Sequence, residues 1–416
     1  VTGVQTCALP IFISILLIFG LILSGCSNSN HSPIPKVKNN SEIHTLKVKP
    51  IDLVQKQIDS MSLDEKIGQL VIIGLDGYTI NNNTINLIKA RKVSGVILFS
   101  KNVENSNQLV KLINSIKTNN QLNRTPMFVS VDEEGGRVSR MPYELKKLPS
   151  NQTIGNKNDS TLSFNTGKII GEELKTYGFN MDFAPVLDIN SNPDNPIIGD
   201  RSFGNNSSIV SKLGIATMKG IINKNIIPVV KHFPGHGDTS VDSHVGLPVV
   251  NKNLKTLNNF ELLPFKSAIN NNVDAIMVAH ILLNKIDSKY PASMSKPVIT
   301  DILRKKLNFN GVVITDDMTM AAIIKYNDIG IAAIRSINAG SDIILVCHEY
   351  NNELKVINSL KTAVQSKRIS EKRLNESVYR ILKLKEKYKL NNDTLNTINT
   401  NKINEINNKI KSFSNY

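Results

Sequence analysis

The chain has 416 residues, of which 40% are hydrophobic, so it can bury one large core of the size that β/α barrels reach as a single domain. Its formal net charge is +15, but the basic residues are scattered and interleaved with asparagine instead of forming one stripe. This pattern argues against a nucleic-acid-binding protein and favours a solvated surface that faces anionic lipid or wall polymer.

The first fifty residues have the composition of a targeting segment. Residues 1–11 lack the basic start of a signal peptide and resemble translated sequencing-adapter sequence, so we exclude them from the fold. Residues 12–26 contain an apolar run too short for a membrane span and end in Leu-Ser-Gly-Cys, which resembles a bacterial lipobox. That resemblance implies cleavage before Cys26, lipid attachment to its thiol, and a flexible tether over residues 27–50. We therefore expect a lipoprotein outside the cytoplasm that contacts the cell membrane through its lipid anchor only. The alternative is an uncleaved anchor helix.

Eight apolar segments alternate with helix-like segments between residues 51 and 390. The predicted strands are Gln69–Leu75, Gly95–Phe99, Met127–Val131, Asn180–Ala184, Ile227–Lys231, Ala275–Ala279, Gly311–Thr315 and Asp342–Cys347. This alternation predicts parallel β/α units, and the count of eight favours a closed (β/α)8 TIM-type barrel in a single domain over an open doubly wound sheet. Residues 391–416 are rich in Asn, Lys and Thr and are interpreted as a polar tail or a frayed helix.

Polar side chains follow several of these strands at the point where each strand ends. They are Asp132, Glu133, Glu134, Asp182, Asp188, Lys231, His232, His280, Asp316 and Asp317. In a barrel these ends meet at one face, where the active sites of such folds lie. We therefore expect a pocket lined by carboxylates, histidine and arginine.

The segment Lys231–His244 concentrates histidine and aspartate directly after a predicted strand. Asp242 precedes His244 by two residues, a spacing that allows the carboxylate to orient the imidazole and raise its basicity for proton transfer. One alternative is a loop histidine in a turn. Another is a metal site built from the histidines and aspartates of this segment, but no ligand pattern fixes a metal geometry here, so we predict none.

The strand Gly311–Thr315 ends in Asp316 and Asp317. A rigid strand end is a suitable support for a nucleophilic carboxylate. The neighbouring aspartate can then cap the next helix, and the alternative is that both aspartates are caps.

Two further stretches offer groups for a hydroxyl-rich ligand. Asp132 and Arg140 begin and end the run DEEGGRVSR, which supplies carboxylate acceptors and guanidinium donors. The two glutamates after Asp132 are as consistent with ion pairs to arginine as with catalysis. Arg201 lies in a glycine-flanked loop from which it can reach the pocket, and the alternative is a structural pair with Asp200.

Five motifs resemble those of the bacterial glycoside hydrolase family 3 β-N-acetylglucosaminidases. They are VDEEGGRVSR, NMDFAPVLDI, IGDRSFG, KHFPGHGDTSVDSH and GVVITDDMTM. The similarity covers about Ile51 to Lys389. It implies a retaining exo-β-N-acetylglucosaminidase that removes terminal N-acetylglucosamine from peptidoglycan fragments through a covalent glycosyl-enzyme intermediate, without a cofactor.

The resemblance also implies roles for individual residues. Asp316 matches the nucleophile, His244 matches the acid/base, and Asp242 matches the group that orients it. The residues that match the sugar-binding positions are Asp132, Arg140, Arg201, Lys231 and His232. Catalysis then requires the loop that carries Asp242 and His244 to close over the strand that carries Asp316. His236 and Asp238 are interpreted as parts of the loop's own architecture.

Three other functions fit the same residues. A phosphorylase is one, because a histidine tolerates an anionic phosphate acceptor better than a carboxylate does. A β-glucosidase is another, and a catalytically inactive wall-sugar-binding lipoprotein is the third.

We expect a monomer. Many lipoprotein members carry a second C-terminal domain that this sequence does not show, so we expect either a one-domain enzyme or a gene cut at both ends.

Overall fold

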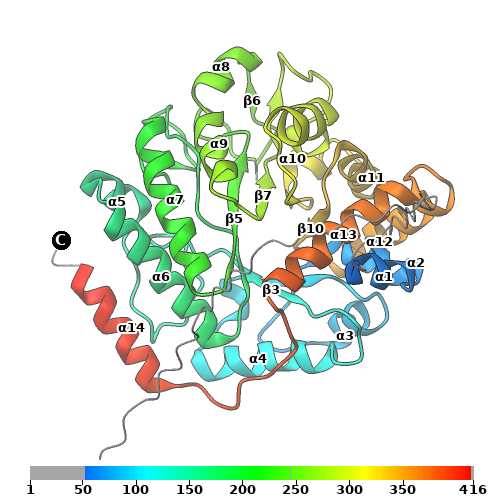
Figure 1. The fold of residues 1–416 in the computed structure, drawn as a ribbon, viewed down its shortest axis with the longest axis horizontal. Helices are drawn as coiled ribbons and strands as arrows, with labels where there is room; N and C mark the ends of the chain where they lie inside the picture. The colour runs from blue at the N-terminus through cyan, green and yellow to red at the C-terminus, as the bar shows by residue number, and fades with distance from the viewer. Residues whose placement is uncertain (1–51, 244, 414–416) are drawn as a thin grey trace, which may run out of the picture. The chain divides into compact units, whose positions relative to one another are not determined.

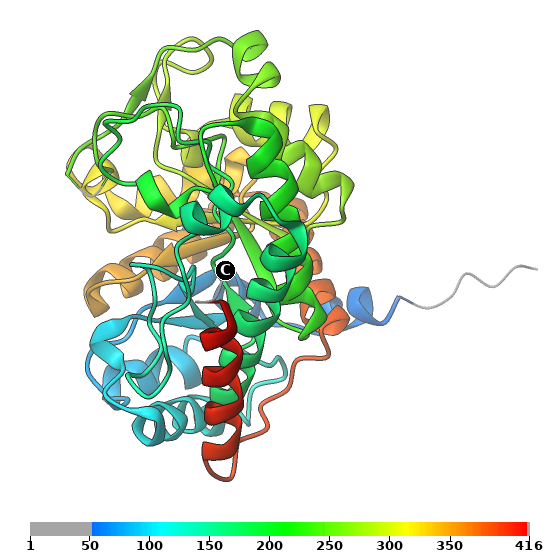
Figure 2. The same ribbon diagram turned by 90° about the vertical axis from the view of Figure 1, so that its left-hand side faces the viewer.

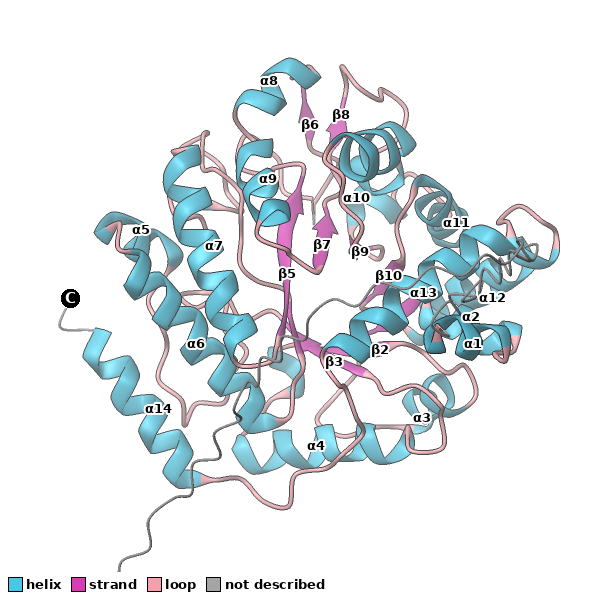
Figure 3. Cartoon of the chain, in the orientation of Figure 1, coloured by secondary structure: helices cyan, strands magenta, loops and turns pink. Residues whose placement is uncertain are grey.

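The computed structural model describes residues 52–243 and 245–413. Within them, eight parallel strands close into a barrel in the order β1-β10-β9-β7-β5-β4-β3-β2 (Figures 1 and 3). These strands are β1 (Val71–Ile73), β2 (Gly95–Leu98), β3 (Phe128–Val131), β4 (Met181–Asp182), β5 (Ile227–Phe233), β7 (Ala275–Val278), β9 (Val312–Asp317) and β10 (Ile343–Val346). The predicted (β/α)8 class is confirmed, and each predicted strand overlaps one barrel strand.

Helices surround the barrel, as Figure 3 shows. The α-helices are α1 (Leu53–Asp59), α2 (Leu63–Gln69), α3 (Asn82–Lys89), α4 (Ser106–Asn119), α5 (Asn151–Lys157), α6 (Ser160–Tyr177), α7 (Ser207–Asn223), α8 (Leu254–Asn259), α9 (Leu262–Asn270), α10 (Ala321–Ile324), α11 (Ile329–Ala339), α12 (Tyr350–Gln365), α13 (Glu371–Lys387) and α14 (Thr400–Phe413). Shorter helical segments are η1 (Ser100–Asn102), η2 (Gly199–Arg201), η3 (Ala292–Met294) and the π-helix η4 (Pro297–Lys306). A separate pair of short parallel strands, β6 (Val249–Val250) and β8 (Leu282–Leu283), lies outside the barrel. Across the described ranges, no helix has the length and hydropathy of a membrane span.

The two ends of the barrel differ in what closes them. Apolar side chains from alternate strand positions, such as Ile72 and Phe128, fill the interior. Tyr388, just beyond α13, joins this interior cluster and donates a hydrogen bond to Asp274, which directly precedes β7. The α13 segment therefore covers the end at which the strands begin. Polar residues gather at the opposite end.

The strand ladder is irregular at two places near that polar end. The register between β5 and β7 shifts between Val230 and Phe233, where Lys231 and His232 lie. The register between β9 and β10 also shifts, so that Leu345 lies opposite Asp317. Such irregularities redirect side chains at barrel rims and next to active sites. Both β5 and β9 also continue two residues beyond their predicted ends.

The segment interpreted as a polar tail or a frayed helix forms α14 at its C-terminal end and packs on α6 (Figures 1 and 2). Its buried side chains are Ile403, Ile406 and Ile410, whose spacing is that of one helix face. Lys409 adds an ion pair with Glu172 of α6, at 2.5 Å. The high Asn and Lys content of this segment obscures its apolar stripe in the sequence.

Some predictions fall outside the described residues. These are the adapter-like residues 1–11, the signal segment with Cys26, the tether over residues 27–50, and the acid/base assignment to His244. They stay predictions.

Candidate active site

A polar cavity of about 330 Å³ opens where the barrel strands end. The predicted site residues that line it are Asp132, Arg140, Arg201, Lys231, His232 and Asp316. They come from the ends of β3, β5 and β9, from the turn after β3, and from η2. The barrel therefore brings together residues that are far apart in the sequence, as the strand-end argument predicts.

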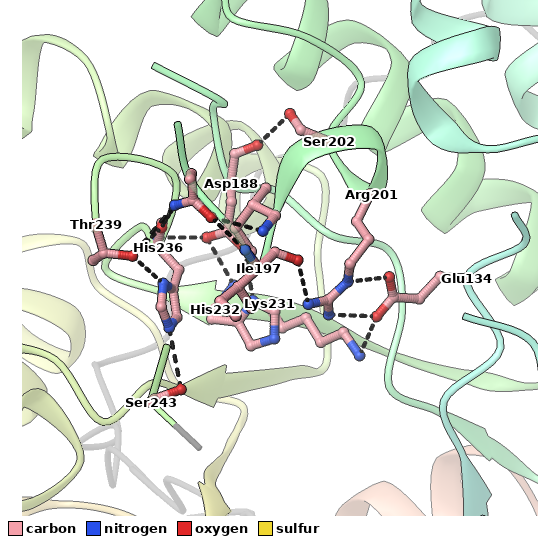
Figure 4. Close-up of polar contacts among 12 residues, drawn as sticks. Glu134, Asp188, Ile197, Arg201, Ser202, Lys231, His232, His236, Thr239 and Ser243 are labelled. Carbon is pink, nitrogen blue, oxygen red and sulfur yellow. Dashed lines mark hydrogen bonds and ion pairs between the residues drawn. The ribbon is translucent and has the colours of Figure 1, made fainter. Parts of the chain in front are cut away.

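A buried ion-pair network forms one side of the cavity. Glu134 binds both Nε and one terminal nitrogen of Arg201 at 2.8 Å, which is a bidentate pair. The ammonium of Lys231 lies 2.7 Å from Glu134 and 2.5 Å from Asp132. Figure 4 shows the carboxylate of Glu134 in contact with the side chains of both Arg201 and Lys231. We define these four residues as the ionic network.

Glu134, Arg201 and Lys231 of the ionic network stay charged at neutral pH. Burial alone would raise the pKa of Glu134, but Arg201 and Lys231 hold it well below its ordinary value. Burial would likewise lower the pKa of Lys231, and Asp132 with Glu134 raises it instead. An ammonium group has three N–H donors, so the two carboxylates leave Lys231 one donor for a ligand hydroxyl.

A second buried pair fixes His232. Its Nδ1 lies 2.6 Å from Asp188, whose other oxygen accepts the backbone N–H of His236 at 2.7 Å. Burial opposes ionisation of Asp188, but the nearby His232 ring lowers the pKa of this carboxyl below its ordinary value. A carboxylate on Nδ1 sets the orientation of the imidazole, so the ring is held at the cavity wall.

The first half of the loop after β5 is held by hydrogen bonds within the loop and by an ion pair. The ring of His236 contacts Thr239 Oγ1 at 2.8 Å and Ser243 Oγ at 3.4 Å (Figure 4). Burial and then the neighbouring His232 lower the pKa of His236 to about 4, so its ring is neutral at physiological pH. Asp238 pairs with Lys252 at 2.9 Å. These contacts agree with the interpretation of His236 and Asp238 as loop architecture, although His236 also lines the cavity.

The second half of the loop contacts α10, the helix that follows the predicted nucleophile. The backbone oxygen of Ser243 accepts a hydrogen bond from the N–H of Ala322 at 3.1 Å. The ammonium of Lys325 donates to the backbone oxygen of Val245 at 2.8 Å. Asp242 is not among the residues that line the cavity, and its backbone oxygen accepts from the next turn of the loop. Its predicted action on His244 stays a prediction.

The two aspartates at the end of β9 have different surroundings. Both line the cavity. The carboxylate of Asp317 accepts hydrogen bonds from the backbone N–H of Thr319 (3.0 Å), the Thr319 hydroxyl (2.5 Å) and the backbone N–H of Cys347 (3.0 Å). Asp317 therefore holds the turn and the end of β10. This division supports the assignment of the nucleophile to Asp316, whose Oδ1 accepts the Asp317 N–H at 2.8 Å.

Sequence reasoning missed several contributors to the site. Asp188 is predicted only as a strand-end carboxylate, and the ion pair to arginine considered for Glu134 is formed with Arg201, a partner that the sequence does not name. The partners of both carboxylates lie tens of positions away in the sequence. Phe99 and His348 also line the cavity and stack on each other with ring centroids 5.5 Å apart.

The structural pair suggested for Arg201 is not formed, because Asp200 pairs with Arg137 at 2.7 Å. Within residues 52–243 and 245–413, no three His, Cys, Asp or Glu side chains are grouped to hold a metal.

A parallel β/α barrel with a cavity of carboxylates, cations and imidazoles at its strand ends belongs to the class of β/α-barrel enzymes. Residues 62–384 match the family described as "Glycosyl hydrolase family 3 N terminal domain". The chain therefore belongs to glycoside hydrolase family 3, as the motifs predict.

Named relatives agree with this membership. The chain is 36% identical over 325 residues to a "Beta-hexosaminidase A" of Pseudoalteromonas piscicida, covering 72% of this chain but only 54% of that protein. It is 32% identical to a "Beta-hexosaminidase" of Nitrosomonas eutropha, covering 76% and 92% of the two chains. Among solved structures, a family 3 β-N-acetylglucosaminidase from a Paenibacillus species superposes with a TM-score of 0.79 at 38% identity, covering 84% and 68%. The chain thus spans about half of the first relative and most of the others.

Proposed function

We propose that this chain is a retaining exo-β-N-acetylglucosaminidase. Its family membership and the names of its relatives support glycoside hydrolase activity of the β-N-acetylhexosaminidase type. The single observation that carries the proposal is the meeting of the ionic network, His232 and Asp316 in one cavity of about 330 Å³. That volume is at the lower end for ligand pockets and suits one terminal sugar unit.

The proposed reaction has two displacements. The Asp316 carboxylate attacks the anomeric carbon as the glycosidic C–O bond breaks, and His244 gives a proton to the departing oxygen. Water then attacks the anomeric carbon of the glycosyl-Asp316 ester while His244 takes the water's proton. This step releases the sugar and restores the carboxylate. Asp242 orients the imidazole and stabilises its cationic form.

The ionic network binds the sugar in this scheme. Asp132 accepts hydrogen bonds from sugar hydroxyls, Arg140, Arg201 and Lys231 donate hydrogen bonds to sugar oxygens, and His232 donates or accepts another. Buried partners already fix Asp132, Arg201, Lys231 and His232, so a sugar binds them without a large ordering cost.

The proposed substrates are peptidoglycan fragments with a terminal β-linked N-acetylglucosamine. The support is the predicted lipobox at Cys26, which would hold the enzyme at the outer surface of the cell membrane, close to wall glycans. The net charge of +15 favours association with anionic wall polymer and lipid.

One assay tests the activity. The protein is incubated with an aryl β-N-acetylglucosaminide, with the matching aryl β-glucoside, and with the first substrate plus inorganic phosphate. We expect release of the chromophore from the N-acetylglucosaminide only, with free sugar as product. Sugar-1-phosphate formation would indicate a phosphorylase, faster glucoside cleavage a β-glucosidase, and sugar binding without turnover an inactive binding protein. Each of these outcomes contradicts the proposal.

A further inference from the structure

Glu133 lies between two cavity residues but does not line the cavity. Asp132 and Glu134 face it, and alternate positions of an extended chain face opposite sides. The side chain of Glu133 is buried, with the residue 1% exposed. Neither the ionic network nor the proposed reaction uses it. A buried carboxyl beside a binding site must be explained by the groups that it binds.

The groups that stabilise the Glu133 carboxylate belong to one turn. Its Oε2 accepts the backbone N–H of Arg140 at 2.8 Å. The backbone N–H of Gly135 and the hydroxyl of Ser139 also favour the charged form of this carboxyl and lower its pKa. Residues 135–140 therefore form a turn whose two ends bind one carboxyl. Gly135 enters this turn with a φ of +80°, a conformation that suits glycine.

The turn carries a sugar-binding arginine. Arg140 lines the cavity, and its Nε is buried with no hydrogen-bond partner among the described residues. Because no acceptor in the described part of the chain holds that Nε, the backbone of the turn sets the place of Arg140. The closest backbone support is the bond from the Arg140 N–H to Glu133.

We infer that Glu133 is a positioning residue for sugar binding: its carboxylate holds the turn 135–140 so that Arg140 is presented to the cavity. When the carboxylate loses its negative charge, its hydrogen bond from the Arg140 N–H weakens and Arg140 is less well placed. This inference rests on the proposed function, because it requires a sugar that Arg140 binds.

Glu133 also belongs to a group of three buried carboxyls. Its backbone N–H donates to Asp182 Oδ1 of β4 at 2.9 Å, while Asp182 Oδ2 is buried without a hydrogen-bond partner among the described residues. Glu173 of α6 faces both of these carboxyls. The remaining charged groups that act on the three are Arg140 on Glu133, Asp132 and Lys231 on Asp182, and Glu172 on Glu173.

All three carboxyls have raised pKa values. Burial raises the pKa of Asp182 and that of Glu173 well above their ordinary values. Burial raises the pKa of Glu133 to about 7, although its hydrogen bonds and Arg140 oppose the shift. As pH falls through about 7, Glu133 takes up a proton and sugar affinity is expected to fall.

The test compares two isosteric variants. Glu133→Gln keeps an oxygen for the Arg140 N–H but has no charge, and Glu173→Gln is the matched control. The control has equal burial, but Glu173 has no hydrogen bond to the turn. KM and kcat for an aryl β-N-acetylglucosaminide are measured between about pH 5.5 and 8.5, a range that spans the titration of a group near neutrality.

The expected result is a KM effect confined to Glu133. At the alkaline end, Glu133→Gln raises KM about fivefold with kcat within about twofold, the size expected when a hydrogen bond to a charged group becomes one to a neutral group. Its KM no longer rises as pH falls, whereas the KM of the wild type and of Glu173→Gln does. Glu133→Ala, which removes every acceptor, raises KM further.

Two kinetic results would overturn the inference. One is a Glu133→Gln enzyme with the wild-type KM at every pH. The other is a parallel loss of kcat and melting temperature with KM unchanged, which indicates a structural role only. Calorimetry with N-acetylglucosamine separates the two proposals. A wild type that neither binds the sugar nor hydrolyses the substrate overturns both, whereas active wild type with equal sugar affinity at pH 6 and pH 8 overturns this inference alone.

Discussion

The ionic network and the loop after β5 are two parts of one cavity, and they are held by different forces. Glu134 and Lys231 are almost fully buried and join strand ends through ion pairs of 2.5 to 2.8 Å. The second half of the loop instead contacts α10 through backbone groups and one lysine, with Val241 41% and Val245 65% exposed. The network therefore has its geometry before a ligand binds, whereas the second half of the loop is attached to α10 by one buried backbone hydrogen bond and one exposed hydrogen bond from Lys325.

This difference matches the two tasks that the proposed reaction requires. Sugar binding benefits from preorganised partners, because fixed side chains lose little entropy when the ligand arrives. Proton transfer at the glycosidic oxygen requires a group above the bond that breaks, and a loop can supply that group after the sugar has entered. Asp316 belongs with the network in this respect, because it lies on the rigid strand β9.

The largest expected effect comes from removing the proposed nucleophile, Asp316, which lies on the rigid strand β9. Asp316→Ala should lower kcat by on the order of 10⁴- to 10⁶-fold, the effect expected for removal of a covalent nucleophile. The matched control is Asp317→Ala, which should lower the melting temperature because three hydrogen bonds are lost, while retaining measurable turnover. Steady-state kinetics of both variants decide which of the two aspartates is the nucleophile. An inactive Asp317→Ala beside an active Asp316→Ala would reverse the assignment.

The next largest expected effect comes from removing His244, which lies in the loop after β5. His244→Ala should slow substrates with poor leaving groups by roughly 10²- to 10⁴-fold, because they depend on acid assistance. Glycosylation of the enzyme by activated aryl substrates should be nearly unchanged, because their leaving group departs without a proton. The measurement is the pre-steady-state burst with a series of aryl leaving groups of different pKa. Equal losses across the series would show that His244 is not the general acid.

A third change tests how the network is held. Glu134→Gln leaves the buried Lys231 and Arg201 without their shared carboxylate, so we expect the free energy of unfolding to fall by about 3–5 kcal/mol. The exposed ion pair between Lys383 and Glu386 provides the control, since Glu386→Gln should change stability by less than about 0.5 kcal/mol. Denaturant unfolding measures the free energy of unfolding of both variants. If the two variants are equally stable, buried ion pairing does not hold this side of the cavity.

The sequence allows more to be predicted about the strand ends than about their partners. The apolar run before Lys231 and the one before Asp316 place these residues at the rim of a barrel, because a parallel strand buried on both faces leaves a local pattern. The pair between Glu134 and Arg201 has no such pattern. It joins residues 67 positions apart and depends on how β3 and η2 are arranged in three dimensions.

The same reasoning explains the other differences. Asp188 fixes both His232 and His236, but an aspartate in a loop does not indicate in the sequence which ring it will bind. The segment that contains α14 is interpreted as a polar tail or a frayed helix because asparagine and lysine dominate its composition, while its stability comes from three isoleucines that pack on α6. Local patterns thus identify strands and their ends, and long-range packing decides the pairs.

The smallest expected effect concerns the attachment of the loop to α10. Lys325→Met removes the hydrogen bond from the ammonium to the Val245 backbone oxygen but keeps the length of the side chain. Because this bond is exposed, we expect less than about 1 kcal/mol of lost stability and at most a fewfold lower kcat, limited to substrates that need acid assistance. KM for the sugar should stay the same, because the ionic network is untouched. Lys355→Met, which breaks the exposed pair with Asp328, is the matched control and should leave kcat unchanged for every substrate. A rise in KM with Lys325→Met would show that the loop also holds the sugar, and the division between a rigid binding side and a separately held loop would then be wrong.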